Sequence, residues 1–274
     1  MKVVLFCGGM GTRLRDYSET IPKPMVPIGY RPLLWHVMKY YAHFGHKDFI
    51  LCLGYKADVV KNYFLHYDEC VSNDFVLSGG GKHVKLLGTD IHDWNITFVD
   101  TGVNSNIGQR LRAVESYLDG DDVFLANYSD GLTDLRLDEY LAEFVRREKV
   151  ASFLAVSPPQ SYHVVEIDGD LATDIRPIRQ AGIRINGGYF AFHRDIFDYL
   201  EDGEELVEEP FRRLMEKRQV IASRYDGYWG CMDTFKDKQQ LEDLYNRGVA
   251  PWEVWKNGRL KPVGELQPET VTGL

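Results

Sequence analysis

The sequence predicts an α/β fold built on a doubly wound, mostly parallel, Rossmann-like sheet. Residues 2–6 form a short apolar run that ends in glycine, as a buried strand does before a tight turn. Apolar residues then follow helical spacing over 33–44, a second buried run covers 48–54, and a second helical pattern covers 57–67. This alternation of strand and helix is typical of a parallel sheet whose faces are covered by helices.

The alternation continues along the chain with one interruption. Residues 20–32 hold four prolines and predict a structured loop. Between 68 and 94, two short apolar runs flank a glycine-rich loop, which predicts a hairpin outside the sheet and a candidate contact between copies of the chain. Further strands are expected at 95–99, 122–127, 151–156, 186–192 and 219–223, a strand-and-turn segment at 163–175, and helices at 108–118, 138–147, 196–200, 206–217 and 236–246.

The composition argues against several classes of protein. A formal net charge of -9 disfavours nucleic acid and membrane surfaces as partners, because both are polyanionic. No apolar run approaches the roughly 18 residues of a membrane span, and we expect no signal peptide because a strand begins at residue 2. The cysteines at 7, 52, 70 and 231 have no zinc-site spacing. A reduced, cytoplasmic protein is the simplest interpretation.

The first strand leads into a glycine-rich loop, G-G-M-G-T-R-L at 8–14, and then P-K-P-M at 22–25. Three glycines within four residues let backbone N–H groups approach an anion, and Arg13 and Lys23 add positive charge for it. The loop is neither a dinucleotide-binding turn, whose third glycine is here Leu14, nor a P-loop, which needs Lys-Ser or Lys-Thr. The alternative is a tight turn without a ligand.

Polar groups also follow the other predicted strands, at 100–102, 129–131 and Asp233. Ligands of open α/β sheets bind beyond the carboxyl ends of the strands, so we expect these groups to converge. Backbone donors, cations and carboxylates suit in-line transfer of a nucleotidyl group between phosphates. The alternatives are that Asp130 is only a turn residue and that Asp233 only caps the last helix.

The glycine loop and P-K-P-M together resemble the signature of the sugar-1-phosphate nucleotidyltransferases. A wider set of motifs resembles the bacterial glucose-1-phosphate cytidylyltransferases over residues 2–256: W-H at 35–36, G-Y-K at 54–56, V-D-T-G at 99–102, R-L at 110–111, N-G-G-Y-F at 186–190, W-G-C-M-D-T at 229–234, K-D-K at 236–238 and A-P-W at 250–252. The resemblance implies an enzyme of nucleotide-sugar and polysaccharide biosynthesis that uses CTP and Mg²⁺ to make CDP-glucose and pyrophosphate, typically as a homo-oligomer.

The resemblance also implies a role for each matched residue. Lys23 and Arg13 would be catalytic, with Lys23 bridging the reacting phosphates. Asp130 and Asp233 would bind Mg²⁺. The nucleotide would be held by Gly8, Gly9, Met10, Gly11, Thr12, Arg13, Thr101, Ser105, Arg110 and Ser129. The phosphorylated acceptor would be held by Arg176, Arg179, Asn186 and Gly187.

Two departures from the family pattern fall in the expected acceptor pocket. The family places Glu-Lys-Pro shortly before Asn-Gly-Gly, where this chain reads I-R-P-I-R-Q at 175–180, and Tyr162-His163 replaces a Phe-Gly step. The acceptor is therefore either a sugar 1-phosphate of the glucose type, or a modified sugar or non-sugar phosphate or phosphonate. A non-catalytic nucleotide-binding regulator is the alternative of another class, disfavoured by the intact Lys23, Asp130 and Asp233. The D-x-D motif of sugar-nucleotide-using glycosyltransferases is absent after the central strand.

We expect one nucleotidyltransferase domain over residues 1–256. Its nucleotide half would cover about 1–150, a small β-rich acceptor lobe about 151–232, and the C-terminal helix 233–256. The polar tail 257–274 would lie over the surface or hang free.

Overall fold

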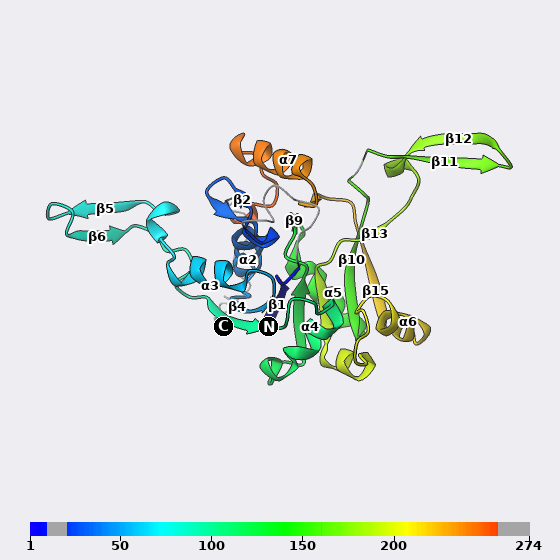
Figure 1. Ribbon diagram of the computed structural model, residues 1–274, viewed down its shortest axis with the longest axis horizontal. Helices are drawn as coiled ribbons and strands as arrows, with labels where there is room; N and C mark the ends of the chain where they lie inside the picture. Colours follow the sequence, from blue (N-terminus) through cyan, green and yellow to red (C-terminus); the bar gives the residue numbers. More distant parts are fainter. Residues whose placement is uncertain (10–20, 160, 257–274) are drawn as a thin grey trace, which may run out of the picture.

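A twisted, mostly parallel sheet runs through the centre of the protein (Figure 1). The computed structural model describes residues 1–9, 21–159 and 161–256. Within these ranges eight strands form the sheet, in the order β13-β10-β14-β8-β1-β4-β7 with β15 beside β10. The parallel half consists of β1 (Lys2–Phe6), β4 (Asp48–Leu53), β7 (Asn95–Asp100) and β8 (Val123–Asn127). The predicted doubly wound fold is confirmed.

The other half of the sheet contains its antiparallel strands. β14 (Phe190–His193) runs antiparallel between β8 and β10 (Ala151–Val156), and β15 (Val220–Tyr225) runs parallel to β10. β13 (Ile185–Asn186) pairs with the end of β10. The strand order therefore reverses at β1, which lies between β4, the next sheet strand along the chain, and β8. Such a reversal is where ligands bind in open α/β sheets.

Helices cover both faces of the sheet, and the alternation of side chains along β1 shows why. Val3 and Leu5 belong to one buried apolar cluster and Val4 and Phe6 to another, because successive residues of a strand point to opposite faces. The first cluster includes α2 (Leu33–His43), α3 (Ala57–Leu65), α5 (Leu137–Arg147) and α7 (Phe235–Asn246), and the second α4 (Ile107–Ala113) and α6 (Glu209–Glu216). No helix within the described ranges is long and apolar enough to cross a bilayer.

Several predicted elements differ in detail from the observed ones. The helix expected at 108–118 breaks after α4 into the 3-10 helix η3 (Glu115–Leu118), and that expected at 196–200 is the 3-10 helix η5 (Arg194–Tyr199). The strand expected at 186–192 is divided into β13 and β14, because Gly188 and Tyr189 have φ angles of 69° and 53°. The predicted loop at 20–32 contains η1 (Lys23–Met25), β2 (Pro27–Ile28) and β3 (Arg31–Pro32). Two short strands that pair with each other were not predicted, β9 (Gly131–Thr133) and β16 (Trp229–Cys231).

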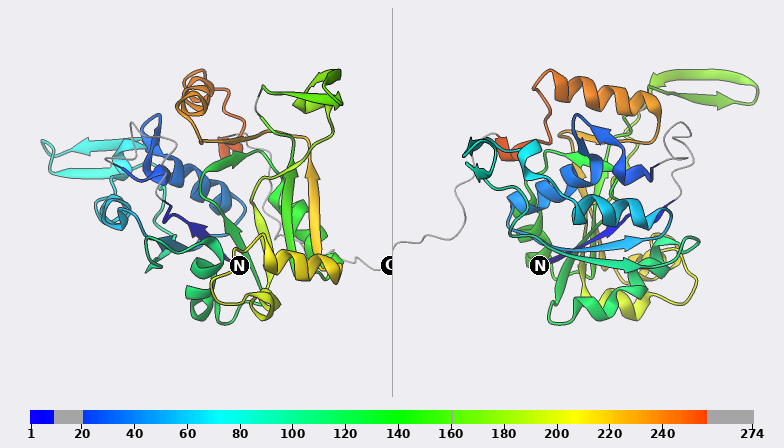
Figure 2. Two further views of the ribbon diagram at one scale, coloured as in Figure 1. Left: turned by 45° about the vertical axis from the view of Figure 1, so that its right-hand side comes forward. Right: turned by 60° about the vertical axis from the view of Figure 1, so that its left-hand side comes forward.

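Two hairpins project from opposite ends of the molecule, outside the central sheet (Figures 1 and 2). The first, β5 (Phe75–Ser78) and β6 (His83–Leu86), confirms the hairpin predicted within 68–94, and the 3-10 helix η2 (Glu69–Val71) precedes it. The second consists of β11 (His163–Asp168) and β12 (Leu171–Pro177), with the 3-10 helix η4 (Ile178–Gln180) after it.

A buried histidine joins the segment after α7, which ends in η6 (Val254–Lys256), to the body. The Nε2 atom of His36 lies 3.1 Å from the carbonyl oxygen of Ile28, and the indole N–H of Trp252 donates to Nδ1 at 3.4 Å. Both partners suit the neutral imidazole, with its proton on Nε2. Burial, assisted by the nearby cations of Lys256 and Arg31 and opposed by the hydrogen bond to Ile28, lowers the pKa of His36 to about 4.

We expect this histidine to make the fold sensitive to acid. An unfolded histidine binds a proton at its ordinary pKa of about 6.5, whereas folded His36 does so only near pH 4. The stabilisation is therefore complete above pH 6.5 and is lost as the pH falls toward 4, with a loss of about 2 kcal/mol between pH 7 and 5. Urea unfolding of wild type and His36→Gln at pH 7 and pH 5 measures this loss of unfolding free energy. Equal pH dependence in the two proteins would contradict this role.

Candidate active site

A pocket of about 540 Å³ opens where the carboxyl ends of β1 and β8 meet, at the point where the strand order reverses. Cys7 and Gly9 reach it from the end of β1, and Tyr128 and Asp130 from the end of β8. The remaining lining residues are Phe6, Lys23, Pro24, Val103, Asn104, Ser105, Asn106, Ile107, Arg110, Glu205 and Asp233. The expected convergence of polar groups from distant strand ends is therefore present.

Lys23 stands between two carboxylates in this pocket. Its ammonium group donates to Asp130 Oδ2 at 2.9 Å and to Asp233 Oδ1 at 2.7 Å. The Lys23 side chain is 15% exposed, while those of Asp130 and Asp233 are 30% and 31% exposed. Burial opposes the charge on Lys23, but the two carboxylates outweigh it and raise the pKa of the ammonium group. The lysine is therefore a fixed cation at neutral pH.

The backbone around Lys23 fixes the start of its side chain. Pro22 precedes it with an extended φ of -71° and ψ of 151°, and Pro24 follows it within η1. The N–H of Met25 donates to the carbonyl of Pro22, and that of Val26 to the carbonyl of Lys23. Because prolines restrict their own φ and the residue before them, few conformations of this segment compete with the observed one.

The two aspartates meet because β9 and β16 pair. Cys231 lies opposite Gly131 in this ladder, and the N–H of Met232 donates to the carbonyl of Asp130 at 2.9 Å. Ser129, just before Asp130, has a positive φ of 65°, and its N–H donates to Asn127 Oδ1 at 2.8 Å. The chain thus turns sharply after β8, directing Asp130 toward the strand that leads to Asp233.

The N-cap of α7 is Thr234 and not Asp233. The Thr234 hydroxyl accepts from the N–H of Asp237, whose carboxylate accepts from the N–H of Thr234 at 2.7 Å. The alternative that Asp233 only caps the helix is therefore wrong, because its carboxylate contacts Lys23. Asp130 likewise is more than a turn residue.

Arg110 lies beneath the pocket and binds its backbone. The guanidinium donates to the carbonyls of Gly8 at 3.1 Å and Leu53 at 3.2 Å, to the hydroxyl of Thr101 at 2.8 Å and to the carbonyl of Val103 at 3.3 Å. The side chain is buried, and burial lowers its pKa. One guanidinium thus joins the last residue of β4 to the segments that follow β1 and β7.

The predicted nucleotide-binding residues are distributed around this arginine. Gly9, Ser105 and Arg110 line the pocket, whereas Thr101 and Ser129 are buried behind it. A Cβ atom on Gly8 would lie 1.9 Å from Arg110 Nη1, so only glycine fits there while the arginine keeps its contacts. Met10, Gly11, Thr12 and Arg13 lie outside the described residues.

The predicted acceptor residues are divided between two places. Asn186 donates to the hydroxyl of Tyr128, a lining residue, at 3.1 Å and so lies beside the pocket. The next residue, Gly187, accepts from the indole of Trp229 at 2.9 Å. Arg176 lies on the projecting β12 and pairs with Glu166 and Asp174. Arg179 donates to the carbonyl of Pro159 at 3.0 Å. The structure does not place either arginine in the pocket lining.

Sequence reasoning missed Glu205, a carboxylate at the other side of the pocket. It accepts from the N–H groups of Ile107 at 3.4 Å and Leu206 at 3.1 Å, and burial raises its pKa. It belongs to an acidic run, E-D-G-E-E, in which no spacing distinguishes it. Asn104 was missed as a lining residue too, although it precedes the predicted Ser105.

Comparisons with known proteins agree on one family. The nucleotidyl transferase family matches residues 2–238. The glucose-1-phosphate cytidylyltransferase of Salmonella typhi is 36% identical over 93% of this chain and 100% of its own length, and a probable glucose-1-phosphate cytidylyltransferase of Bacillus subtilis is 34% identical over the same shares. A crystal structure of a putative glucose-1-phosphate thymidylyltransferase from Bacillus anthracis superposes with a TM-score of 0.64 at 17% identity, covering 91% of this chain and 95% of that one.

We expect Arg110→Lys to destabilise the fold, because an ammonium group cannot reach all the acceptors that the guanidinium binds. Unsatisfied buried carbonyls would lower the free energy of unfolding by roughly 3 kcal/mol. The matched control is Arg146→Lys on the exposed face of α5, which should change it by no more than about 0.5 kcal/mol. Urea unfolding compares the two, and equal stability of both variants would contradict the role given to Arg110.

Proposed function

The chain belongs to the nucleotidyl transferase family, and on this basis we propose that it transfers a cytidylyl group from CTP to a sugar 1-phosphate. The products would be a CDP-sugar and pyrophosphate, with Mg²⁺ as the cofactor. Full-length similarity to glucose-1-phosphate cytidylyltransferases supports both the nucleotide and the type of acceptor. A cytoplasmic location and a homo-oligomeric state belong to the same proposal.

The observation that carries this proposal is the position of Lys23 between Asp130 and Asp233 in the pocket. In nucleotidyl transfer, a phosphate oxygen of the acceptor attacks the α-phosphorus of the triphosphate, and the bond to pyrophosphate breaks in line. A sugar phosphate is already ionised near neutral pH, so its attack requires no general base. The protein's task is then to position two anions and to neutralise their charge.

Asp130 and Asp233 fit a divalent cation. Their carboxylates approach one point, which the Lys23 ammonium occupies, and carboxylate oxygens are the protein ligands that Mg²⁺ prefers. Within the described ranges no group of three or more potential metal ligands occurs, and Mg²⁺ in nucleotide sites takes one or two carboxylates with water and phosphate oxygens. When bound, Mg²⁺ would neutralise charge on the triphosphate.

The chain's own residues would bind and position the two substrates. Lys23, released from one carboxylate, would contact phosphate oxygens of the reacting groups as a compact positive charge. Backbone N–H groups of the glycine loop would contact the triphosphate. Arg110 would act indirectly, since its hydrogen bonds to the carbonyls of Gly8 and Val103 hold that backbone in place. Asn186 would orient Tyr128 at the acceptor side.

Fewer observations support the identity of the acceptor than support the transfer reaction. Arg176 and Arg179, which stand where the family pattern has Glu-Lys-Pro, make their contacts outside the pocket lining. This favours a second candidate with the same chemistry, in which the acceptor is a modified sugar phosphate or a non-sugar phosphate or phosphonate.

We expect pyrophosphate release from CTP and Mg²⁺ when a suitable phosphorylated acceptor is present. A panel of glucose 1-phosphate, other sugar 1-phosphates, and non-sugar phosphates and phosphonates distinguishes the two candidates by turnover. Lys23→Ala should lower kcat/KM by roughly a thousandfold, as removal of a charge-stabilising donor does. Lys47→Ala is the matched control, because Lys47 pairs with an aspartate, Asp93, outside the pocket lining. An unchanged rate in Lys23→Ala would overturn the catalytic role, and no turnover with any acceptor would overturn the proposed reaction.

Neighbouring residues at the start of α7 should separate activity from stability. Asp233→Asn should lower kcat by at least tenfold and raise the Mg²⁺ concentration needed for half-maximal rate, because one metal-binding charge is lost. Thr234→Ala removes the N-cap and should cost about 1 kcal/mol of unfolding free energy with little effect on kcat. Pyrophosphate assays and urea unfolding measure both variants. A Thr234→Ala rate as low as that of Asp233→Asn would show that the cap, rather than the carboxylate, matters.

A further inference from the structure

The pocket has two parts that differ in charge. Lys23 and its two aspartates form the part that suits phosphates and a divalent cation. The other part is lined by residues 103–107, which carry apolar, amide and hydroxyl side chains, and by the carboxylate of Glu205. The guanidinium of Arg110 in this part already donates to four acceptors of the protein. Because a carboxylate repels phosphate, this second part suits an uncharged portion of a substrate.

Tight packing fixes Glu205 in this position. The residue lies in the segment that joins η5 to α6, and this segment packs against the start of α4. The side chain of Asn106 donates to the carbonyl of Gly203 at 2.9 Å. A Cβ atom on Gly108 would lie 2.2 Å from the carbonyl oxygen of Glu204, so the two backbones approach closely only because residue 108 is glycine. The carboxylate is therefore held at the pocket by its neighbours on both sides.

The Glu205 carboxylate still has room for a further donor. It accepts from the N–H groups of Ile107 at 3.4 Å and Leu206 at 3.1 Å, which use two of the roughly four lone-pair positions of a carboxylate. The side chain is half-buried, and burial raises its pKa, so its charge is poorly solvated. Ile107 is the first residue of α4, and its N–H has no partner inside the helix. By accepting from this N–H, Glu205 gives the pocket wall an acceptor in place of a backbone donor.

The sheet topology indicates which substrate this acceptor faces. Residues 103–107 follow β7, which lies on the β4 side of β1, whereas Asn186 in β13 lies on the β8 side. In a transfer reaction the two substrates extend in different directions from the reacting phosphates. With the acceptor near Asn186, the nucleoside extends toward residues 103–107 and Glu205. Cytosine carries an amino donor at position 4 of its ring, where uracil and thymine carry a carbonyl acceptor.

We propose that Glu205 is a specificity-determining residue, whose carboxylate accepts a hydrogen bond from the 4-amino group of cytosine and so selects CTP over UTP and dTTP. An ionised carboxylate has no proton to donate, so the 4-carbonyl of uracil or thymine would face another acceptor. Both groups would then lose their hydration without gaining a hydrogen bond, which is how a polar site rejects a close analogue. The inference rests on the proposed function, since it assigns the base end of that same site.

The test compares two charge-neutralising variants of the same acidic segment. Glu205→Gln keeps the shape of the side chain, but its amide can present either its oxygen or its NH₂ group to the base. We expect it to reduce the preference for CTP over UTP by roughly tenfold or more. Glu208→Gln is the matched control, because Glu208 is exposed and outside the pocket lining, and it should keep the preference within about threefold of wild type. Isothermal titration calorimetry with Mg²⁺ and each nucleotide, without acceptor, measures the preference.

A nucleotide without the 4-substituent isolates the contact itself. Wild type should bind the triphosphate of pyrimidin-2-one riboside roughly tenfold or more weakly than CTP. Glu205→Ala should bind the two within about threefold of each other, because it has no carboxylate for the amino group to contact. Circular dichroism verifies that each variant folds.

The outcomes separate this inference from the proposed reaction. An undiminished preference for CTP in Glu205→Gln, or a wild type that binds CTP and UTP equally, would overturn the role of Glu205 even if pyrophosphate release proceeds. A preference for CTP that is lost in Glu205→Gln and kept in Glu208→Gln would support the role. If no acceptor then gave turnover, only the proposed reaction would fail.

Discussion

The ion pairs of Lys23 with Asp130 and Asp233 connect three segments that are far apart in the sequence, and the site depends on them. Each charge is partly buried, and each would be costly if left without a partner. The three segments therefore have to meet for the fold to be stable at this edge of the sheet. The cluster can also exchange partners with ligands. An incoming cation can replace Lys23 beside the aspartates, and an incoming phosphate can replace an aspartate beside Lys23.

This geometry comes mostly from the backbone. Tyr189, with its positive φ of 53°, donates its hydroxyl to the carbonyl of Gly131 at 2.9 Å, just after Asp130. The ladder between β9 and β16 then aligns the two aspartates. A non-glycine residue in the left-handed region costs free energy that its surroundings have to offset. Ser129 and Tyr189 are both of this kind, and both are fully buried beside the pocket.

The sequence predicts the sheet and the convergence of charges well, because these depend on patterns of a few residues. Apolar runs located the strands of the central sheet. Asp130 attracted attention because it follows an expected strand, and Asp233 because it lies in the W-G-C-M-D-T motif just before an expected helix. Spacing says nothing about three-residue strands such as β9, or about the positive φ angles that divide β13 from β14. Arg176 was expected near the acceptor because it stands where the family pattern has Glu-Lys-Pro, but it lies on the projecting β11–β12 hairpin, where it pairs with Glu166. Glu205 had no pattern to identify it because its position depends on tertiary packing.

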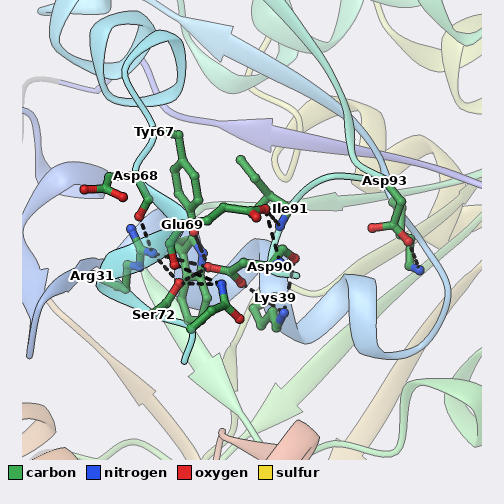
Figure 3. A network of polar contacts seen from close by, with 12 residues as sticks. Arg31, Lys39, Tyr67, Asp68, Glu69, Ser72, Asp90, Ile91 and Asp93 are labelled. Atoms are coloured by element: carbon green, nitrogen blue, oxygen red, sulfur yellow. Dashed lines mark hydrogen bonds and ion pairs between the residues drawn. The ribbon is translucent and has the colours of Figure 1, made fainter. Parts of the chain in front are cut away.

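Buried Asp90, which follows the β5–β6 hairpin, accepts hydrogen bonds from Arg31 and from Ser72, which precedes the hairpin (Figure 3). These contacts hold both ends of the hairpin to the body of the protein. The carbonyl of Asp68, before the hairpin, and the carboxylate of Asp90, after it, both accept hydrogen bonds from Arg31 in β3, so the hairpin leaves and re-enters the body at one place. The register of β4 against β7 involves no residue of the hairpin, so we expect a change in the hairpin's length or composition to leave that register unaltered. Mutations that alter this hairpin and mutations that alter the pocket can therefore accumulate independently, so the surface at this end of the molecule can diversify without passing through variants with a damaged site.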